Sequence, residues 1–167
     1  GAAVARAFAK QGVKVAIHGH SNMEQADRVA QDIHRTGGEA IVLKADIRSA
    51  EQCTQLVKEA YTGLGHIDIL INNAGLGTSA AERARGDTDI DYDRWERMFR
   101  VNALAPFYIA QTFRDHLKQS QQKKLVTITS QMGSTARASG GAWPYRSTKA
   151  AVNNIMHGLA AQWAVEG

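Results

Sequence analysis

The sequence predicts an α/β fold in which a doubly wound parallel sheet carries helices on both faces. The first observation is that short apolar, β-branched runs alternate along the chain with helical patterns of ten or more residues. Such alternation is typical of right-handed βαβ crossovers, which pack helices on both sides of a parallel sheet. The second observation is length, because 167 residues suffice for one domain with a sizeable core. Residues 1–167 are therefore expected to form a single domain.

The elements of the first half are assigned from hydrophobic periodicity and from capping residues. The run that begins at Val13 has no charge except Lys14, which fits a strand buried on both faces. Ser49 and Gln52 form a capping-box pattern at the start of a helix. In chain order we expect a helix over Gly1–Gln11, a strand over Val13–Ile17, a helix over Asn22–Arg35, a strand over Ala40–Leu43, a helix from Ser49 and a strand over Ile67–Ile71.

The second half of the chain continues the alternation after a polar stretch. Thr78 to Asp91 shows no hydrophobic period, which predicts an exposed loop. A long helical pattern runs from Tyr92 to Gln119, with a soft interruption expected at Pro106. Leu125 to Thr129 is the last expected strand, and a final helix is expected over Tyr145 to Val165.

Composition excludes several functional classes. Hydrophobic residues make up 44% and charged residues 22%, the profile of a soluble globular protein. The net charge of +4 is scattered along the chain, so no nucleic-acid partner is expected. Cys53 is the only cysteine and the histidines lack ligand spacing, so neither a disulfide nor a metal site is expected. No apolar run reaches the roughly 18 residues of a membrane span. We therefore expect a cytoplasmic protein with no membrane partner.

The stretch from Ser130 to Lys149 carries three groups suited to proton chemistry. Tyr145 and Lys149 lie four residues apart, so on a helix they share one face. A free phenol has a pKa of about 10, and a fixed cation beside it favours the phenolate. Such a pair can transfer a proton at neutral pH, while Ser130, at the end of a strand, could hold a substrate oxygen. By itself the short, common pattern is far more typical of ordinary neighbours on a helix surface than of a catalytic pair.

Polar residues also follow the other expected strands, where ligands of open α/β sheets bind. The tetrapeptide Asn72-Asn73-Ala74-Gly75 allows close approach to its backbone, although Asn and Gly are also common in plain turns. Asp46-Ile47 could contact a ligand or simply present a solvated carboxylate. Asn102 lies inside a helical pattern, where it could serve a site or be a hydrogen-bonded core amide.

Together these motifs resemble the short-chain dehydrogenase/reductases. They occur in the family's order over nearly the whole chain, as Gly1–Ala5, Asp46-Ile47, Asn72–Gly75, Val101-Asn102-Ala103, Ser130 and Tyr145–Lys149. The resemblance implies a Rossmann-like, NAD(P)-binding domain. It also implies an oxidoreductase that transfers a hydride between NADP(H) and a carbonyl or secondary alcohol. Among members of the family, the 3-oxoacyl-carrier-protein reductases and ketone reductases are the most similar in character.

The resemblance also implies a role for each matching residue. Tyr145 corresponds to the general acid/base, and Lys149 to the cation that favours its ionised form and holds the nicotinamide ribose. Ser130 corresponds to the hydroxyl that orients the carbonyl, and Asn102 to the residue that supports a proton-relay water. The implied cofactor-binding residues are Gly1, His20, Ser21, Asn22, Asp46, Ile47, Asn73, Ala74 and Gly75, together with Tyr145 and Lys149.

The choice of cofactor rests on the residues directly after the strand that begins at Val13. An Asp or Glu there would accept from both ribose hydroxyls of NAD and repel a 2′-phosphate. The chain instead offers His20, Ser21 and Asn22 as donors, although no Arg or Lys directly follows that strand. We therefore expect NADPH to be used in preference to NADH.

The sequence departs from the family pattern in three ways. Only Gly1 remains of the Gly-rich motif, so the expected domain lacks the first strand of the family fold. The chain also stops at Gly167, before the segment that normally covers the substrate. Finally, the spacing from Ser130 to Tyr145 is longer than most members show.

Two further expectations concern activity and assembly. A non-catalytic NADP-binding sensor or scaffolding homologue is the alternative function, but such a homologue need not retain all four catalytic residues. Two long helices carry apolar residues beyond one face, whereas a helix that covers a sheet needs only one stripe. These residues are Phe99, Leu104, Phe107 and Phe113 in one helix and Val152, Ile155, Met156, Leu159 and Trp163 in the other. A homodimer or homotetramer is therefore expected.

Overall fold

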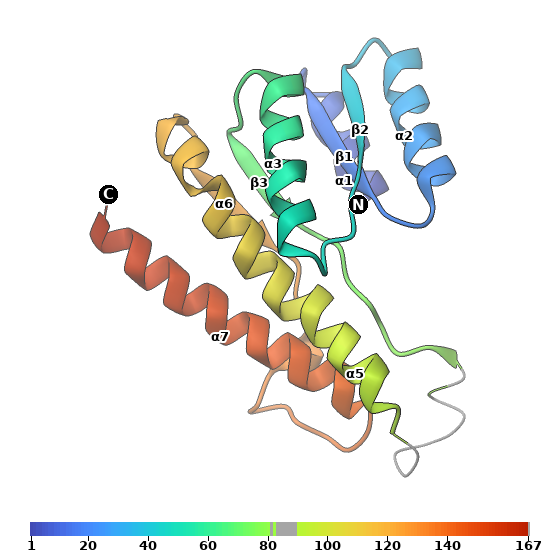
Figure 1. The fold of residues 1–167 in the computed structure, drawn as a ribbon, viewed down its shortest axis with the longest axis vertical. Coiled ribbons are helices and arrows are strands. Elements are labelled where there is room, and N and C mark those ends of the chain that lie inside the picture. Colours follow the sequence, from blue (N-terminus) through green and yellow to red (C-terminus); the bar gives the residue numbers. More distant parts are fainter. Residues whose placement is uncertain (81, 83–89, 167) are drawn as a thin grey trace. The chain divides into compact units, whose positions relative to one another are not determined.

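Helices and strands alternate along the chain in the order that the apolar runs predict (Figure 1). The computed structural model describes residues 1–80, 82 and 90–166. The first elements are α1 (Ala2–Ala9), β1 (Val15–Gly19), α2 (Met23–Arg35), β2 (Ala40–Lys44), α3 (Ala50–Leu64) and β3 (Ile69–Asn72). The remaining elements are α5 (Tyr92–Phe99), a π-helical turn (Arg100–Leu104), α6 (Ala105–Gln119), β4 (Lys124–Thr127), a 3-10 turn (Gln131–Gly133) and α7 (Trp143–Glu166).

Side-chain caps fix where several helices begin. The Asn22 side chain accepts from the Gln25 N–H at 3.1 Å at the start of α2. The Ser49 hydroxyl accepts from the Gln52 N–H at 3.2 Å at the start of α3. Only this half of the predicted capping box forms, because the Gln52 side chain accepts from the Asp46 N–H instead, at 2.8 Å. Each cap satisfies a backbone donor that the first helical turn leaves without a partner.

The described residues group into two compact units. The first unit comprises Gly1–Leu70 and Thr112–Lys124. Its β1 and β2 pair in parallel, from Val15 opposite Ala40 to Gly19 opposite Lys44. Residues of α1 and α2 form a core with these strands, in which Val29 and Ile33 are buried. Helix α3 packs against the same two strands, and Figure 1 shows α2 and α3 flanking the pair.

The second unit comprises Ile71–Gln111 and Leu125–Gly167. Within it α7 packs against α5, the π-helical turn and the 3-10 turn. Met98, Ala103 and Val152 are almost completely buried in its core. The Ile128 N–H donates to the Asn72 carbonyl at 2.8 Å, just beyond the pairing of β3 with β4. These contacts bring the ends of β3 and β4 to the first half of α7.

The structure shifts some of the predicted boundaries. Strand β1 begins two residues later than predicted and includes His18 and Gly19, which the sequence placed in the following loop. The described strands form two two-stranded sheets, β1 with β2 and β3 with β4. Most of the loop predicted over Thr78–Asp91 lies outside the described residues, because 81 and 83–89 are not described. No described helix is both long and apolar enough to cross a membrane.

The long predicted helix is interrupted ahead of Pro106 rather than at it. Residues Arg100–Leu104 form a π-helical turn, in which the Ala105 N–H donates to the Arg100 carbonyl. Proline has no N–H, so in an α-helix the Asn102 carbonyl, four residues earlier, would lack its donor. A π-helical turn is a known way to absorb such a disruption, and such turns are frequent at functional sites.

Candidate functional site

The buried amide of Asn102 joins three segments of the second unit. Asn102 is only 1% exposed and projects from the π-helical turn. Its Oδ1 accepts from the Leu76 N–H at 2.7 Å, and its Nδ2 donates to the Leu76 carbonyl at 2.8 Å. The same Nδ2 donates to the Thr148 hydroxyl at 3.0 Å, and that hydroxyl donates to the Tyr145 carbonyl at 2.8 Å. Asn102 therefore fixes the loop after β3 against the first turns of α7.

Tyr145 and Lys149 lie on the same face of α7, as their spacing predicts. The Lys149 ammonium is 5.8 Å from the centre of the Tyr145 ring. Lys149 is 6% exposed, and its Nζ donates to the Ile128 carbonyl at 3.1 Å. Burial lowers the pKa of the Lys149 ammonium from its ordinary value, because the charged form loses hydration. The half-buried Tyr145 thus has a fixed cation as its neighbour.

Ser130 caps the 3-10 turn, and this turn rests directly on the backbone of α7. The Ser130 hydroxyl accepts from the Met132 N–H at 3.1 Å. A Cβ added to Gly133 would lie 2.7 Å from the carbonyl carbon of Lys149, a distance that real contacts do not reach. Asn153 adds a further link, because its Nδ2 donates to the Gly133 carbonyl at 3.4 Å. Gly133 therefore lets the turn that carries Ser130 approach the helix that carries Lys149.

The predicted loop after β3 lies beside these groups. A Cβ at Gly75 would be 3.3 Å from Asn102 Oδ1 and 3.7 Å from Lys149 Nζ. Asn73, Ala74 and Gly75 are all exposed, so their backbone is accessible next to the buried Asn102 amide and Lys149 ammonium. Ser130, Tyr145, Lys149, Asn102 and the Asn73–Gly75 loop thus all lie in the second unit. That they form one site stays a prediction.

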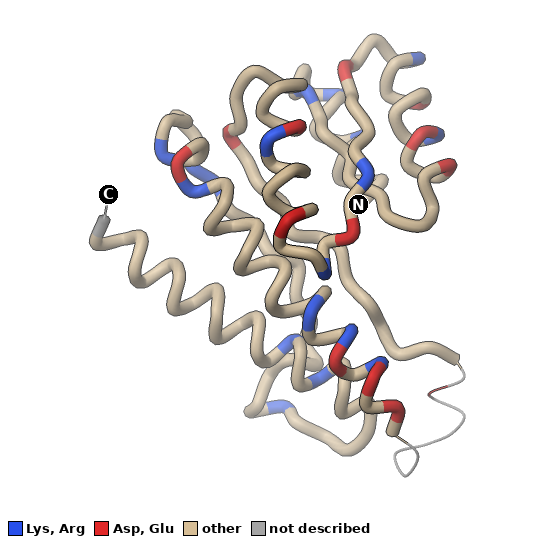
Figure 2. Tube along the Cα trace, in the orientation of Figure 1, with Lys and Arg blue, Asp and Glu red and all other residues tan. Residues whose placement is uncertain are grey.

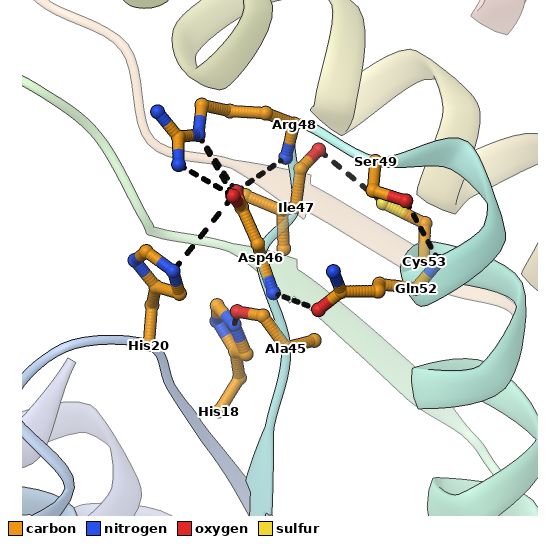
Figure 3. A network of polar contacts seen from close by, with 9 residues as sticks. All are labelled: His18, His20, Ala45, Asp46, Ile47, Arg48, Ser49, Gln52 and Cys53. Atoms are coloured by element: carbon orange, nitrogen blue, oxygen red, sulfur yellow. Dashed lines mark hydrogen bonds and ion pairs between the residues drawn. The ribbon is translucent and has the colours of Figure 1, made fainter.

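In the first unit, a network of charged groups surrounds Asp46 (Figure 3). Arg48 forms a bidentate ion pair with the Asp46 carboxylate, with Nε 2.8 Å from Oδ1 and Nη2 2.5 Å from Oδ2. His20 Nε2, from the residue after β1, lies 3.8 Å from Asp46 Oδ2. Hydrogen bonds from Arg48, with a smaller contribution from the nearby His20, lower the pKa of the Asp46 carboxyl to about 2. Asp46 is therefore ionised at neutral pH and paired rather than simply solvated.

The remaining predicted residues of the first unit lie around the ends of β1, β2 and α1. Gly1 is the N-cap of α1 and accepts from the Ala5 N–H at 2.9 Å. Ser21 is exposed, and the Asn22 amide is engaged in capping α2, with Nδ2 3.3 Å from Gln25 Oε1. The Ile47 carbonyl accepts from the buried Cys53 thiol at 3.3 Å. The Asn22 side chain thus caps α2, and a ligand that bound this side chain would have to replace its hydrogen bonds to Gln25.

Sequence reasoning missed three residues that hold these groups in place. Thr148 links Asn102 to α7, Gly133 admits the 3-10 turn, and Arg48 pairs with Asp46. Thr148 lies inside the Tyr145–Lys149 motif, so its position in the motif could have marked it as a residue of the site. Arg48 lies two residues after Asp46, a spacing at which an ion pair depends on the loop conformation. The described residues contain no group of three or more His, Cys, Asp or Glu side chains suited to a metal ion.

Parallel β1 and β2, helices around them and polar residues after the strands define a Rossmann-like α/β protein. The sequence profile of the short chain dehydrogenases matches residues 1–167. The chain belongs to this family of oxidoreductases.

Individual relatives are similar to this chain over nearly its whole length. Versicolorin reductase of Emericella nidulans is 28% identical over 96% of this chain. A hydroxynaphthalene reductase-like protein of Metarhizium robertsii is 30% identical over 96% of it. The crystal structure of a short chain dehydrogenase from Burkholderia cenocepacia in complex with NADP is 28% identical over 100% of this chain, with a TM-score of 0.86. The chain spans 58%, 57% and 65% of the lengths of these three proteins.

Replacing Gly133 by Ala should destabilise the second unit. The added methyl group meets the backbone of Lys149, which cannot rotate away as a side-chain end could, and overpacking of this kind costs about 1–3 kcal/mol. Denaturant unfolding of the variant measures the loss. Gly140→Ala is the matched control, because a Cβ there meets nothing within 4 Å. Equal stability of the two variants would show that the close approach at Gly133 does not exist in solution.

Proposed function

We propose that this protein is an NADP(H)-dependent oxidoreductase that interconverts a carbonyl and a secondary alcohol. The observation that carries the proposal is the buried Lys149 ammonium beside the ring of Tyr145, in the same unit as Ser130 and Asn102. Reductases among the relatives support the direction of carbonyl reduction. We also propose that residues 1–167 act as one dinucleotide-binding domain of a cytoplasmic protein.

The Gly75 loop fits a bound dinucleotide. Its backbone has no Cβ beside the Asn102 amide and the Lys149 ammonium, so a ribose could approach both groups closely. Lys149 would donate hydrogen bonds to the ribose hydroxyls of the nicotinamide half. In the first unit, His20, Ser21, Asp46 and Ile47 would contact the adenosine half. When bound, NADPH supplies the hydride for the reaction.

Tyr145 would hold and deliver the proton in this mechanism. Its phenol donates to the carbonyl oxygen as negative charge develops there, and the nearby Lys149 ammonium stabilises the phenolate that remains. Ser130 would donate a second hydrogen bond to the same oxygen and so fix the orientation of the carbonyl. Because burial lowers the pKa of Lys149, its ammonium returns a proton more readily than a solvated lysine would.

Asn102 would supply the route by which that proton is replaced. Its side-chain amide is fully used by Leu76 and Thr148, so the side chain holds structure rather than a ligand. Its backbone carbonyl differs, because Pro106 has no N–H with which to complete the α-helical pattern. We propose that this carbonyl accepts from a water molecule that passes protons to Lys149.

NADPH is the proposed cofactor because of the charge balance around Asp46. A bare carboxylate at this place would repel a 2′-phosphate and accept from the ribose hydroxyl of NAD. Here Arg48 chelates the carboxylate and His20 faces it, so an incoming phosphate meets no uncompensated negative charge. The NADP complex of the Burkholderia cenocepacia relative supports the same cofactor.

Replacing Tyr145 by Phe should reduce turnover at least about a hundredfold, because general acid/base catalysis typically supplies 10²–10⁴-fold. NADPH binding, measured by fluorescence, should be unchanged, since only the hydroxyl is lost. Tyr92→Phe is the control, because Tyr92 is an exposed tyrosine at the start of α5. Lys149→Ala should weaken both turnover and NADPH binding. Wild-type turnover in the Tyr145→Phe variant would refute the mechanism. A wild-type protein that binds NADPH but oxidises it with none of a panel of ketones would favour a non-catalytic, cofactor-sensing protein.

Wild-type enzyme should use NADPH better than NADH, and Arg48→Ala should reduce that preference by about tenfold, or 1.4 kcal/mol. The substitution leaves Asp46 without its chelating partner, so the carboxylate repels the 2′-phosphate. The measurements are kcat/KM with each cofactor and the affinity for 2′,5′-ADP. Arg28→Ala is the control for charge, since Arg28 pairs with the exposed Glu24 on the surface of α2. Equal or better use of NADH by the wild type would contradict the cofactor assignment.

A substitution at Arg48 tests the cofactor preference more cleanly than a substitution at Gly19, the last residue of β1. An Asp at Gly19 would create the carboxylate of an NAD site, but its Cβ would lie 2.9 Å from Met23 Sδ and 3.3 Å from Ala26 Cβ. That variant would disturb the packing of α2 on β1 together with the charge. Arg48→Ala changes the charge balance with no such contact.

Assembly into a homodimer or homotetramer is proposed from the surface of the π-helical turn, α6 and α7. Leu104 is 53% exposed and Phe107 38%, although Phe113, Val152 and Leu159 are buried. Between Lys149 and Val165, α7 has no Lys, Arg, Asp or Glu, and Figure 2 shows this length without charged residues. The exposed apolar side chains of Leu104 and Phe107 and, separately, the long uncharged stretch of α7 are both features typical of interfaces between copies of a chain.

Leu104→Glu combined with Phe107→Glu should convert the assembly to monomers, because two charges would be buried at the contact. Light scattering at micromolar concentration measures the mass. Val13→Glu, at an exposed apolar residue of the first unit, is the control and should leave the mass unchanged. A wild-type protein that scatters as a stable monomer would rule the proposal out.

A further inference from the structure

One arginine holds the irregular segment that links Ser130 to Tyr145. Residues 134–142 join the 3-10 turn to α7 without regular secondary structure, and 135–140 are exposed. Arg146, the residue after Tyr145, contacts this segment at two points. Its Nε donates to the Gly141 carbonyl at 2.9 Å, and its Nη2 donates to the Ser139 hydroxyl at 2.5 Å.

The backbone at the end of this segment adopts a conformation that few residues tolerate. Gly141 has a φ of +84° and Ala142 a φ of +53°. Among the described residues, Lys123 is the only other non-glycine residue with a positive φ. Such conformations persist only where the surroundings hold them, and they cluster at functional sites. Here the Arg146 guanidinium binds the Gly141 carbonyl, and the Arg146 N–H donates to the Ala142 carbonyl at 3.0 Å.

The other end of the segment is fixed to the same helix. Gly133 lies against the Lys149 backbone, and Asn153 donates to the Gly133 carbonyl. The segment therefore begins and ends on α7, with Ser130 just before one anchor and Tyr145 just before Arg146. An arginine is suited to the second anchor, because its planar fork presents several donors at once and a lysine presents a single point of charge.

We propose that Arg146 is a positioning residue that clasps residues 134–142 onto α7 and thereby fixes the wall of the substrate site beside Ser130 and Tyr145. The proposal rests on the proposed function for the roles of Ser130 and Tyr145. It assigns to Arg146 an effect on substrate binding and selectivity, with cofactor binding and proton transfer left intact. The proposal also gives a role to the unusually long spacing between Ser130 and Tyr145, because the residues that Arg146 contacts lie within it.

Kinetics of Arg146→Ala separate positioning from catalysis. The KM for a bicyclic ketone such as 2-tetralone should rise at least about tenfold, because the variant loses both side-chain hydrogen bonds and even one from a charged donor is worth about that factor. The NADPH dissociation constant should stay within about twofold, because the clasp does not touch the cofactor residues. Arg146→Lys should restore part of the effect, since one donor can still reach one acceptor. A loss of NADPH affinity as large as the rise in KM would overturn the proposal.

Proteolysis tests the clasp without any turnover. Arg137 lies in the exposed part of the segment and is a trypsin site. In Arg146→Ala the rate of cleavage after Arg137 should rise about tenfold, because cleavage follows the population of the opened segment. Gly141→Ala should raise it as well by straining the turn, and Gly140→Ala, which meets nothing within 4 Å, should not. Unchanged cleavage in both Arg146→Ala and Gly141→Ala would refute the clasp.

The two experiments distinguish this proposal from the proposed function. Retained turnover in Tyr145→Phe removes the catalytic assignment, and the cleavage rate then still decides whether the clasp exists. An inactive Tyr145→Phe together with an unchanged KM and cleavage rate in Arg146→Ala refutes the clasp alone.

Discussion

In the second unit, the side-chain amide of Asn102 completes the hydrogen bonding of Leu76 and donates to Thr148. A buried amide without partners would cost about 1–3 kcal/mol, so these bonds oblige the three segments to stay together. One segment carries Gly75, and another carries Tyr145 and Lys149. The distances from Gly75 to Lys149 and to Asn102 therefore follow from the satisfaction of a single buried side chain.

The π-helical turn is what makes Asn102 available for this purpose. In a continuous α-helix, Pro106 would leave the Asn102 carbonyl without a donor and would crowd it with its ring. The turn accommodates the proline and presents Asn102, with its side chain buried, toward Leu76 and Thr148. A sequence feature that first reads as a helix interruption thus places the central hydrogen-bonding residue of the unit. The side-chain amide of Asn102 thus stabilises the fold, whereas its backbone carbonyl is the proposed acceptor for a water molecule.

The sequence predicts the elements well because their signals are local. Asn22 and Ser49 cap helices as their residue types indicate, and the spacing of Tyr145 and Lys149 already places them on one face. What it cannot predict depends on contacts between distant residues. Gly133 is required by the Lys149 backbone, sixteen positions away, and no local pattern distinguishes it from Gly140. The partner of Arg146 likewise depends on the path of a segment that has no periodicity at all.

The charge cluster at Asp46 shows how a carboxylate can stand near a site for an anionic ligand. Its pKa of about 2, against an ordinary 3.8, means that pairing with Arg48 stabilises the fold above pH 3.8, and this stabilisation is lost as the pH falls through about 2. At neutral pH the Asp46–Arg48 pair therefore has constant, nearly zero net charge. It follows that the pair removes the repulsion of a phosphate at every physiological pH.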